Sequence, residues 1–424
     1  MFQQSPKIFN SLKICCIALL LVFSSCQSKS QEGASKSNTP LENINKNEIT
    51  WNPSIDDALA QAKSTGKILF VECYSPTCPI CLSLEPFFKK TEIATKFNSN
   101  FINYKLDVGN AEQVKFLNAR NIWLPSFPQF LFFDENGTII HQAEVVAENK
   151  SFLAAADAAL NPENRASGFK KKFDNGDRSL DLLVALSSYA RVTRDTLTNL
   201  SAAEELFKIY PKDQLNSETS WKLTKKCVGD IDNGFAKHWF NNVATATAFE
   251  KKDGHVGNEN NILGGIIQNS LYSPRGRNYN SQKLNQIKQL MAKAGAGQYA
   301  DGVTWEFETA ALIKEGKPEA ALVIGDKIAA KYIANGQSLV YITKVFNDKY
   351  PNKNYGTKAG VWMAKAKPLL NEDKYLAEYY FESARLNKNI GNAAVAKKDA
   401  QEARNLAIKA QLDLTRFTAL LGSI

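Results

Sequence analysis

The chain has 424 residues, of which 44% are hydrophobic and 22% are charged, and it carries a formal net charge of +9. Its lysines and arginines are interleaved with aspartates and glutamates, and no basic run is dense enough to indicate a nucleic-acid-binding protein. The three histidines, His141, His238 and His255, do not stand at the spacing of metal ligands. The sequence therefore predicts a protein of more than one domain, with no metal and no cofactor.

The N-terminus is typical of an export signal. Lys7 and Lys13 form a positive region, and the apolar run Ile14–Phe23 is too short to span a bilayer. Small residues precede Cys26, and this arrangement resembles the lipidation site of bacterial lipoproteins. We expect residues 1–25 to be a signal peptide of the lipoprotein type, with Cys26 lipidated. A plain signal peptide is the alternative, because Phe23 stands where an aliphatic residue is usual.

Export reduces the number of the seven cysteines that are available as thiols in the mature protein. Two of them lie within the signal peptide, and Cys26 would carry the lipid. The exported protein keeps Cys73, Cys78, Cys81 and Cys227, in a compartment where disulfides persist. Four cysteines in so long a chain favour one working pair over a disulfide framework.

Residues 26–48 are polar and indicate a flexible linker between lipid and domain. Residues 49–162 then alternate between strand and helix patterns, which predicts an α/β domain. Strands are expected at 49–51, 68–74, 101–108, 130–133 and 138–146, with helices at 54–62, from the paired cysteines to about 98, at 111–119 and at 149–160.

The strand signals stop near residue 164, so 165–424 is expected to be an all-α array of helical hairpins. Trp305–Ala310 and Tyr379–Ala384 are similar and stand 74 residues apart, twice a spacing close to that of tetratricopeptide repeats. Alanines at heptad-like spacing predict one last helix from 396 to 421. Residues 254–265 and 273–279 are expected to be loops, and the tryptophans and Cys73 and Cys227 to be buried.

Cys78-Pro79-Ile80-Cys81 follows the expected strand at 68–74 and opens a helix. A thiolate at a helix N-terminus is stabilised by free N–H groups and by the helix dipole, which activates it. Pro79 suits the first turn, where its missing N–H costs nothing. Cys78 would attack a substrate disulfide, and Cys81 would resolve the mixed disulfide.

These residues, together with their surroundings, resemble the thioredoxin superfamily over residues 49 to about 160. Glu72 stands where thioredoxins carry a buried acid that assists proton transfer at the resolving cysteine. Pro86 matches the proline that kinks the active-site helix, and the segment from Phe127 to Gly137 matches the one that opens with the cis-proline loop. The resemblance implies a central mixed sheet flanked by helices, a cis Pro128 facing the dithiol, and substrate binding by Pro128 and Phe127.

Three departures from the family pattern bear on the direction of the reaction. Thr77 replaces a tryptophan, Leu82 replaces a lysine, and Gln129 replaces a threonine. No histidine stands between the cysteines, so one stabiliser of the thiolate is missing. We expect a reductant, and a potential near about −120 mV would contradict this.

Other interpretations of the cysteines stay open at this point. The spacing of Cys73, Cys78 and Cys81 formally matches that of plant-type ferredoxins, with Cys227 as a distant fourth ligand. A structural zinc site lacks a second cysteine pair. A thioredoxin-like fold with an idle dithiol is a further alternative, and so is a pairing of Cys73 with Cys227.

Two functions remain. The first is an exported, lipid-anchored thiol–disulfide oxidoreductase on the periplasmic or outer face of a bacterial membrane. Its partners would be client proteins with thiols or disulfides and an upstream electron donor or acceptor, with clients docked by the helical array. The second is a non-catalytic adaptor, in which the array is a scaffold.

Overall fold

The structure, a computed structural model, describes residues 47–424. These fall into two compact units, and the division lies between Asp301 and Gly302. The expected signal peptide, the lipidation at Cys26 and almost all of the expected linker lie outside the described residues. The predicted domain boundaries, 49–162 and 165–424, stay predictions.

The first unit opens with a four-stranded mixed sheet in the order β2-β1-β3-β4. Strands β1 and β2 are parallel, and β3 is antiparallel to both β1 and β4. The strands are β1 (Ile68–Tyr74), β2 (Phe101–Asp107), β3 (Gln129–Phe133) and β4 (Ile139–Ala143). The helices of this part are α2 (Ile55–Thr65), α3 (Pro79–Phe88), α4 (Thr91–Asn100), α5 (Ala111–Ala119) and α6 (Asn149–Leu160).

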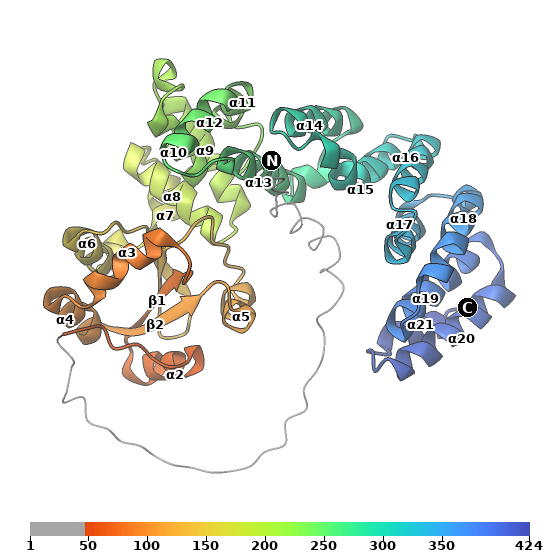
Figure 1. The fold of residues 1–424 in the computed structure, drawn as a ribbon, viewed down its shortest axis with the longest axis horizontal. Coiled ribbons are helices and arrows are strands. Elements are labelled where there is room, and N and C mark those ends of the chain that lie inside the picture. The colour runs from red at the N-terminus through yellow and green to blue at the C-terminus, as the bar shows by residue number, and fades with distance from the viewer. Residues whose placement is uncertain (1–46) are drawn as a thin grey trace, which may run out of the picture. The chain divides into compact units, whose positions relative to one another are not determined.

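Helices cover both faces of the sheet (Figure 1). Because side chains alternate along a strand, Phe70 and Phe132 face α3, α4 and α6, while Leu69 and Phe133 face α2 and α5. The first face holds an aromatic cluster of edge-to-face and tilted rings, such as Phe70 with Phe130 at 4.8 Å. The predicted α/β architecture is confirmed.

The expected elements match closely where a local signal is strong. Ser54 caps α2 by accepting from the Asp57 N–H, and Gly66 ends that helix in the left-handed region. The long helix expected after the cysteines is instead two helices, because Lys90 takes an extended conformation and starts α4. The strand expected at 49–51 is reduced to a single bridge between Trp51 and Asn103.

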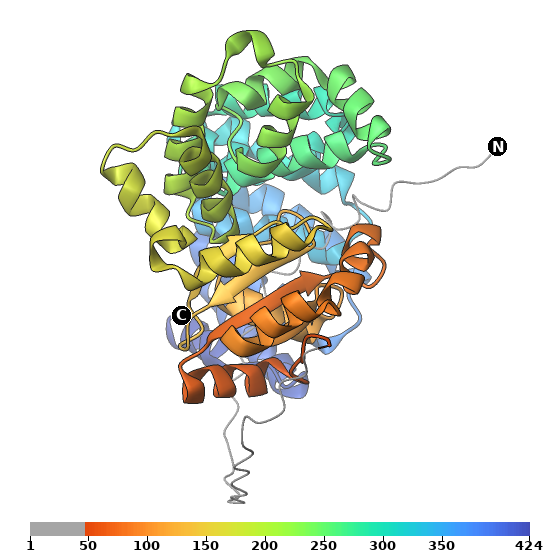
Figure 2. The same cartoon turned by 90° about the vertical axis from the view of Figure 1, so that its left-hand side faces the viewer.

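Helices follow without a further strand in the described part of the chain. In Figures 1 and 2 the orange sheet is followed by yellow and green helices of the same compact unit. They are α7 (Phe169–Asp174), α8 (Leu180–Val192), α9 (Thr196–Ile209), α10 (Glu218–Cys227), α11 (Gly234–Asn241), α12 (Val243–Lys252), α13 (Asn258–Tyr272) and α14 (Ser281–Lys293). After α15 (Ala300–Lys314), the second unit contains α16 (Pro318–Lys331), α17 (Gly336–Lys349), α18 (Gly356–Ala366), α19 (Asp373–Ile390), α20 (Ala393–Lys409) and α21 (Thr415–Gly422).

Helix α8 packs directly on the α/β part. Its last residue, Val192, belongs to the core on the α2–α5 face, and its carbonyl accepts the Trp123 N–H at 2.9 Å. Ser188 accepts from Gln142 of β4 at 2.9 Å, and Tyr189 donates to the Ile139 carbonyl at 3.0 Å. The first helices of the array therefore complete the core of the α/β part.

Two predictions about the helical region are wrong. Residues 258–265 were expected in a loop, but they form the start of α13, since Leu263, Ile266 and Ile267 are buried and outweigh the low helix propensity of Gly264 and Gly265. The last helix is divided, because Gln411 has a φ of 55° and separates α20 from α21.

The two similar segments both lie in helices, α15 and α19, and each helix is followed by a glycine at positive φ, Gly316 and Gly391. The alanine seam of α20 packs on α19 through Ala403 and Ala407. No helix within residues 47–424 is long and apolar enough to cross a membrane.

Candidate active site

The paired cysteines lie where β1 ends and α3 begins. Cys78 is the N-cap of α3, and its Sγ accepts the backbone N–H of Cys81 at 3.3 Å. Pro79 occupies the first turn. Both cysteines are free thiols; Cys78 is partly exposed and Cys81 is buried. The geometry thus leaves the Cys78 sulfur accessible at the N-terminus of a helix and buries Cys81 in the first turn behind it.

The loop before β3 faces this pair. The peptide bond between Phe127 and Pro128 is cis, as the resemblance implies. The Cys78 thiol points at the Phe127 carbonyl, with a distance of 4.0 Å between sulfur and oxygen. Phe127 is 42% exposed and Ile80 is 50% exposed, so apolar side chains flank the accessible sulfur.

Glu72 lies in β1, the strand that leads to the paired cysteines, and it is fully buried. Alternation along β1 places its side chain on the α3 face of the sheet, whereas Cys73 faces the α2–α5 core. Within residues 47–424 neither carboxylate oxygen of Glu72 has a hydrogen-bond partner. Its nearest cation, Lys105 Nζ, is 3.6 Å from Oε2, which is longer than a hydrogen bond.

Burial is the main cause of the pKa shifts of Glu72 and Cys81. Burial raises the pKa of Glu72 to about 8, against a smaller lowering by Lys105 and a further rise from the charge of Glu85. Burial is also the largest cause that raises the pKa of Cys81 to about 12, and the charge of Glu72 adds to it. A thiol that is so reluctant to ionise needs a nearby proton acceptor, and Glu72 has a pKa suited to that role near neutral pH.

Two residues of the site were missed by the sequence reasoning. Lys105 stands opposite Glu72 in the parallel register of β1 and β2, and it also forms an ion pair with Glu85 of α3. The signal for Glu85 was present, since it lies four residues after Cys81 on the same helix. The position of Lys105 depends on strand register, which is not visible in the sequence.

The other cysteines lie away from the pair. Cys73 and Cys227 are both fully buried, as predicted, and burial raises the pKa of Cys227 to about 12. Cys73 belongs to the core on the α2–α5 face, whereas Cys81 stands in α3, whose Leu84 and Phe88 pack on the opposite face of the sheet. This arrangement does not suit the shared cluster of the ferredoxin interpretation. Among the described residues no group of three or more histidine, cysteine or acidic side chains is arranged to hold a metal ion.

Comparisons with known proteins agree with this fold. The sequence model of the Thioredoxin-like family matches residues 50–135, so this part of the chain is a thioredoxin-like domain. The chain is also similar to thioredoxin H4 of Arabidopsis thaliana, with 28% identity over 105 residues. That match covers 25% of this chain and 77% of the relative.

Proposed function

We propose that this protein is an exported, lipid-anchored thiol–disulfide oxidoreductase that uses the Cys78–Cys81 pair. The observation that carries the proposal is the combination of a partly exposed cysteine at a helix N-terminus, a buried cysteine three residues later, and the buried carboxylate of Glu72, which accepts no hydrogen bond from the described residues.

In the reducing direction, the Cys78 thiolate attacks a client disulfide, forms a mixed disulfide and releases one client thiolate. Glu72 takes the proton of Cys81, whose thiolate then attacks the Cys78 sulfur. The Cys78–Cys81 disulfide forms, and the second client sulfur leaves and is protonated. The client gains two electrons, which an upstream dithiol must restore to the pair.

Phe127 and Pro128 support binding of the client backbone. Their loop faces Cys78, and the exposed ring of Phe127 offers an apolar contact beside the reacting sulfur. We assign these residues to substrate binding, and Cys78, Cys81 and Glu72 to catalysis.

Docking of clients by the helical array is supported by a groove of about 590 Å³ between α8, α9 and α10. Leu180, Val184, Ile209 and Leu223 contribute its apolar lining. Lys226, also in the lining, forms an ion pair with Glu144, just after β4, at 2.9 Å. The start of β3 pairs with the ends of both β1 and β4, so Glu144 lies at the same end of the sheet as the strand that leads into the dithiol.

Export and anchoring rest on the N-terminal sequence, and membrane fractionation of cells tests them. The catalytic part is tested with Cys78→Ser, Cys81→Ser and the double variant. We expect Cys78→Ser to abolish reduction of a protein disulfide and Cys81→Ser to accumulate a mixed disulfide with clients. Hydrogen exchange on that trapped complex should show protection in α8–α10.

The adaptor function is the alternative outcome of the same experiment. If the double variant supports growth as well as the wild type, and no mixed disulfide accumulates, the dithiol is idle and the oxidoreductase proposal is wrong. If the dithiol is active, the redox potential of the Cys78–Cys81 pair gives the direction of electron flow. A value near about −120 mV would contradict the expectation of a reductant.

A further inference from the structure

Lys105 is shared unequally between two carboxylates. Its Nζ forms a hydrogen-bonded ion pair with Oε1 of Glu85, while Oε2 of Glu72 is 3.6 Å away. Glu72 is fully buried, Lys105 is 20% exposed at its side chain, and Glu85 is 38% exposed. The three groups therefore form a series from the interior to solvent.

Aromatic rings hold the ammonium group of Lys105 in this place. Its Nζ lies 4.6 Å from the ring centroid of Tyr74, 5.5 Å from that of Phe88 and 5.7 Å from that of Trp51. These faces attract a cation and shield it from water. Lys105 is thus stabilised at the Glu85 end of the series without full contact to Glu72.

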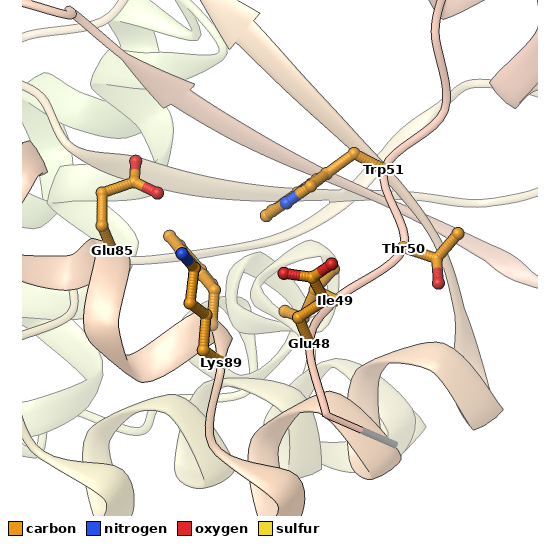
Figure 3. Close-up of a pocket in the computed structure, with 7 residues that line it drawn as sticks. Glu48, Ile49, Thr50, Trp51, Glu85 and Lys89 are labelled. Carbon is orange, nitrogen blue, oxygen red and sulfur yellow. The ribbon is translucent and has the colours of Figure 1, made fainter. Parts of the chain in front are cut away.

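A cavity of about 340 Å³ adjoins the outer end of this series, because Glu85 is part of its lining. Figure 3 shows Glu85 and Lys89 on one wall and Glu48, Thr50 and Trp51 on the other. This cavity is lined by the end of α3 and the segment before α2, whereas Phe127 and Pro128 approach α3 at its beginning, at Cys78. A client bound at Cys78 would leave it open.

We propose that Glu85 is a positioning residue for the reaction: it holds Lys105 on the solvent side and, through that lysine, sets how readily Glu72 accepts and returns a proton. The inference rests on the proposed function, in which Glu72 receives the proton of Cys81. When the Cys78–Cys81 disulfide has formed, the protonated Glu72 returns its proton to water by way of the Lys105–Glu85 side. No electrons move in this step, and the carboxylate of Glu72 is regenerated.

The charges around Glu72 determine in which direction its titration moves when Glu85 is replaced. Among the described residues, Lys105 from β2 and Glu85 from α3 act on Glu72, the Cys81 thiol lies on α3, and β3 presents the apolar Phe130. Replacing Glu85 by glutamine removes a negative charge and frees Lys105 to approach Glu72. Both changes favour ionised Glu72, so its titration must move to lower pH.

The test is an infrared titration of the full chain that follows the carbonyl band of the protonated Glu72, assigned by its absence in Glu72→Gln. In Glu85→Gln we expect the midpoint to fall by about one pH unit or more, a tenfold change in proton affinity. Lys105→Met should move it in the opposite direction. The matched control is Glu135→Gln, in the exposed turn at the other end of β3, which should leave the midpoint unchanged.

An unchanged midpoint in Glu85→Gln overturns the inference. The pH profile of thiol–disulfide exchange by the same variants then tests the connection to the reaction, and it should shift with the infrared midpoint. If the wild type exchanges no disulfide at all, the proposed function fails, while the infrared shift still shows whether Glu85 controls Glu72. If exchange occurs and its profile does not follow the infrared midpoint, the role of Glu85 in the reaction is wrong.

Discussion

Two fully buried glutamates, Glu72 and Glu250, differ in the hydrogen bonds that their carboxylates accept. Glu72 lies between the sheet and α3, Glu250 lies in α12, and both are fully buried. Glu250 accepts hydrogen bonds from Trp221 Nε1 at 2.6 Å, Lys225 Nζ at 2.7 Å and Asn258 Nδ2 at 2.8 Å. Glu72 accepts none from the described residues.

The pKa shifts of the two groups are opposite as a result. At Glu250, burial raises the pKa, but the hydrogen bonds and the charge of Lys225 outweigh it, and the net pKa lies below the ordinary value. At Glu72, burial prevails and the pKa rises to about 8. A buried carboxylate with a full set of donors stabilises the fold as an anion, while one without them is poised to exchange a proton near neutral pH.

The largest expected effect is the loss of Glu250. Glu250→Ala leaves the Lys225 ammonium and two N–H donors without their partner, and it should lower the free energy of unfolding by about 3–5 kcal/mol. Denaturant unfolding followed by tryptophan fluorescence measures this. Glu204→Gln, an exposed change in α9, is the control and should stay within about 0.5 kcal/mol.

Glu250→Gln keeps the size and one acceptor of the side chain and is the second variant if the alanine variant does not fold. It should lose less stability than Glu250→Ala. A loss below about 1 kcal/mol for both would show that the donors find other partners, and the contrast with Glu72 would disappear.

Glu72→Gln should have the opposite effect, and the effect should depend on pH. The folded pKa of about 8 lies above the ordinary value of 4.5, so the stability that neutral Glu72 provides is complete below 4.5 and is lost as pH rises through 8. The variant escapes this loss. Its stability relative to wild type should increase by about 3 kcal/mol between about pH 6 and pH 9.

Denaturant unfolding of both proteins at a series of pH values checks this prediction, because other titrating groups cancel in the difference. Parallel curves would mean that Glu72 is solvated or charged in the folded protein. In that case the two glutamates would not differ in how burial affects their ionisation.

Local sequence was sufficient for much of the fold near the site. The apolar run Ile68–Tyr74 is β1 over its full predicted length, and 149–160 is α6. The prediction failed where packing overrides propensity, as at Gly264 and Gly265 in α13, and where one backbone rotation ends a helix, as at Gln411. Neither event has a strong local signal.

In the candidate site, too, some residues could be predicted from the sequence and others could not. Cys78, Cys81 and their helix are adjacent in the sequence, so motif and element order place them together. Lys105 reaches Glu72 only through the register of two parallel strands 33 residues apart, Glu72 opposite Lys105. The charge balance that sets the pKa of Glu72 therefore required the structure.

The smallest predicted effect comes from removing one of the three hydrogen-bond donors of Glu250, which makes its surroundings more like those of Glu72. Trp221→Phe removes one donor to Oε1 but leaves Lys225 and Asn258 in place, and the ring can still pack edge-to-face on Trp239, 5.1 Å away in the wild type. The free energy of unfolding at pH 7 should fall by about 1–2 kcal/mol. Because Glu250 would then be stabilised less as an anion, its pKa should rise, and the variant should lose stability at a higher pH than wild type as the solution is acidified. Acid unfolding followed by far-ultraviolet circular dichroism measures both effects, and a variant that unfolds at the same pH as wild type would show that Lys225 and Asn258 alone keep Glu250 charged.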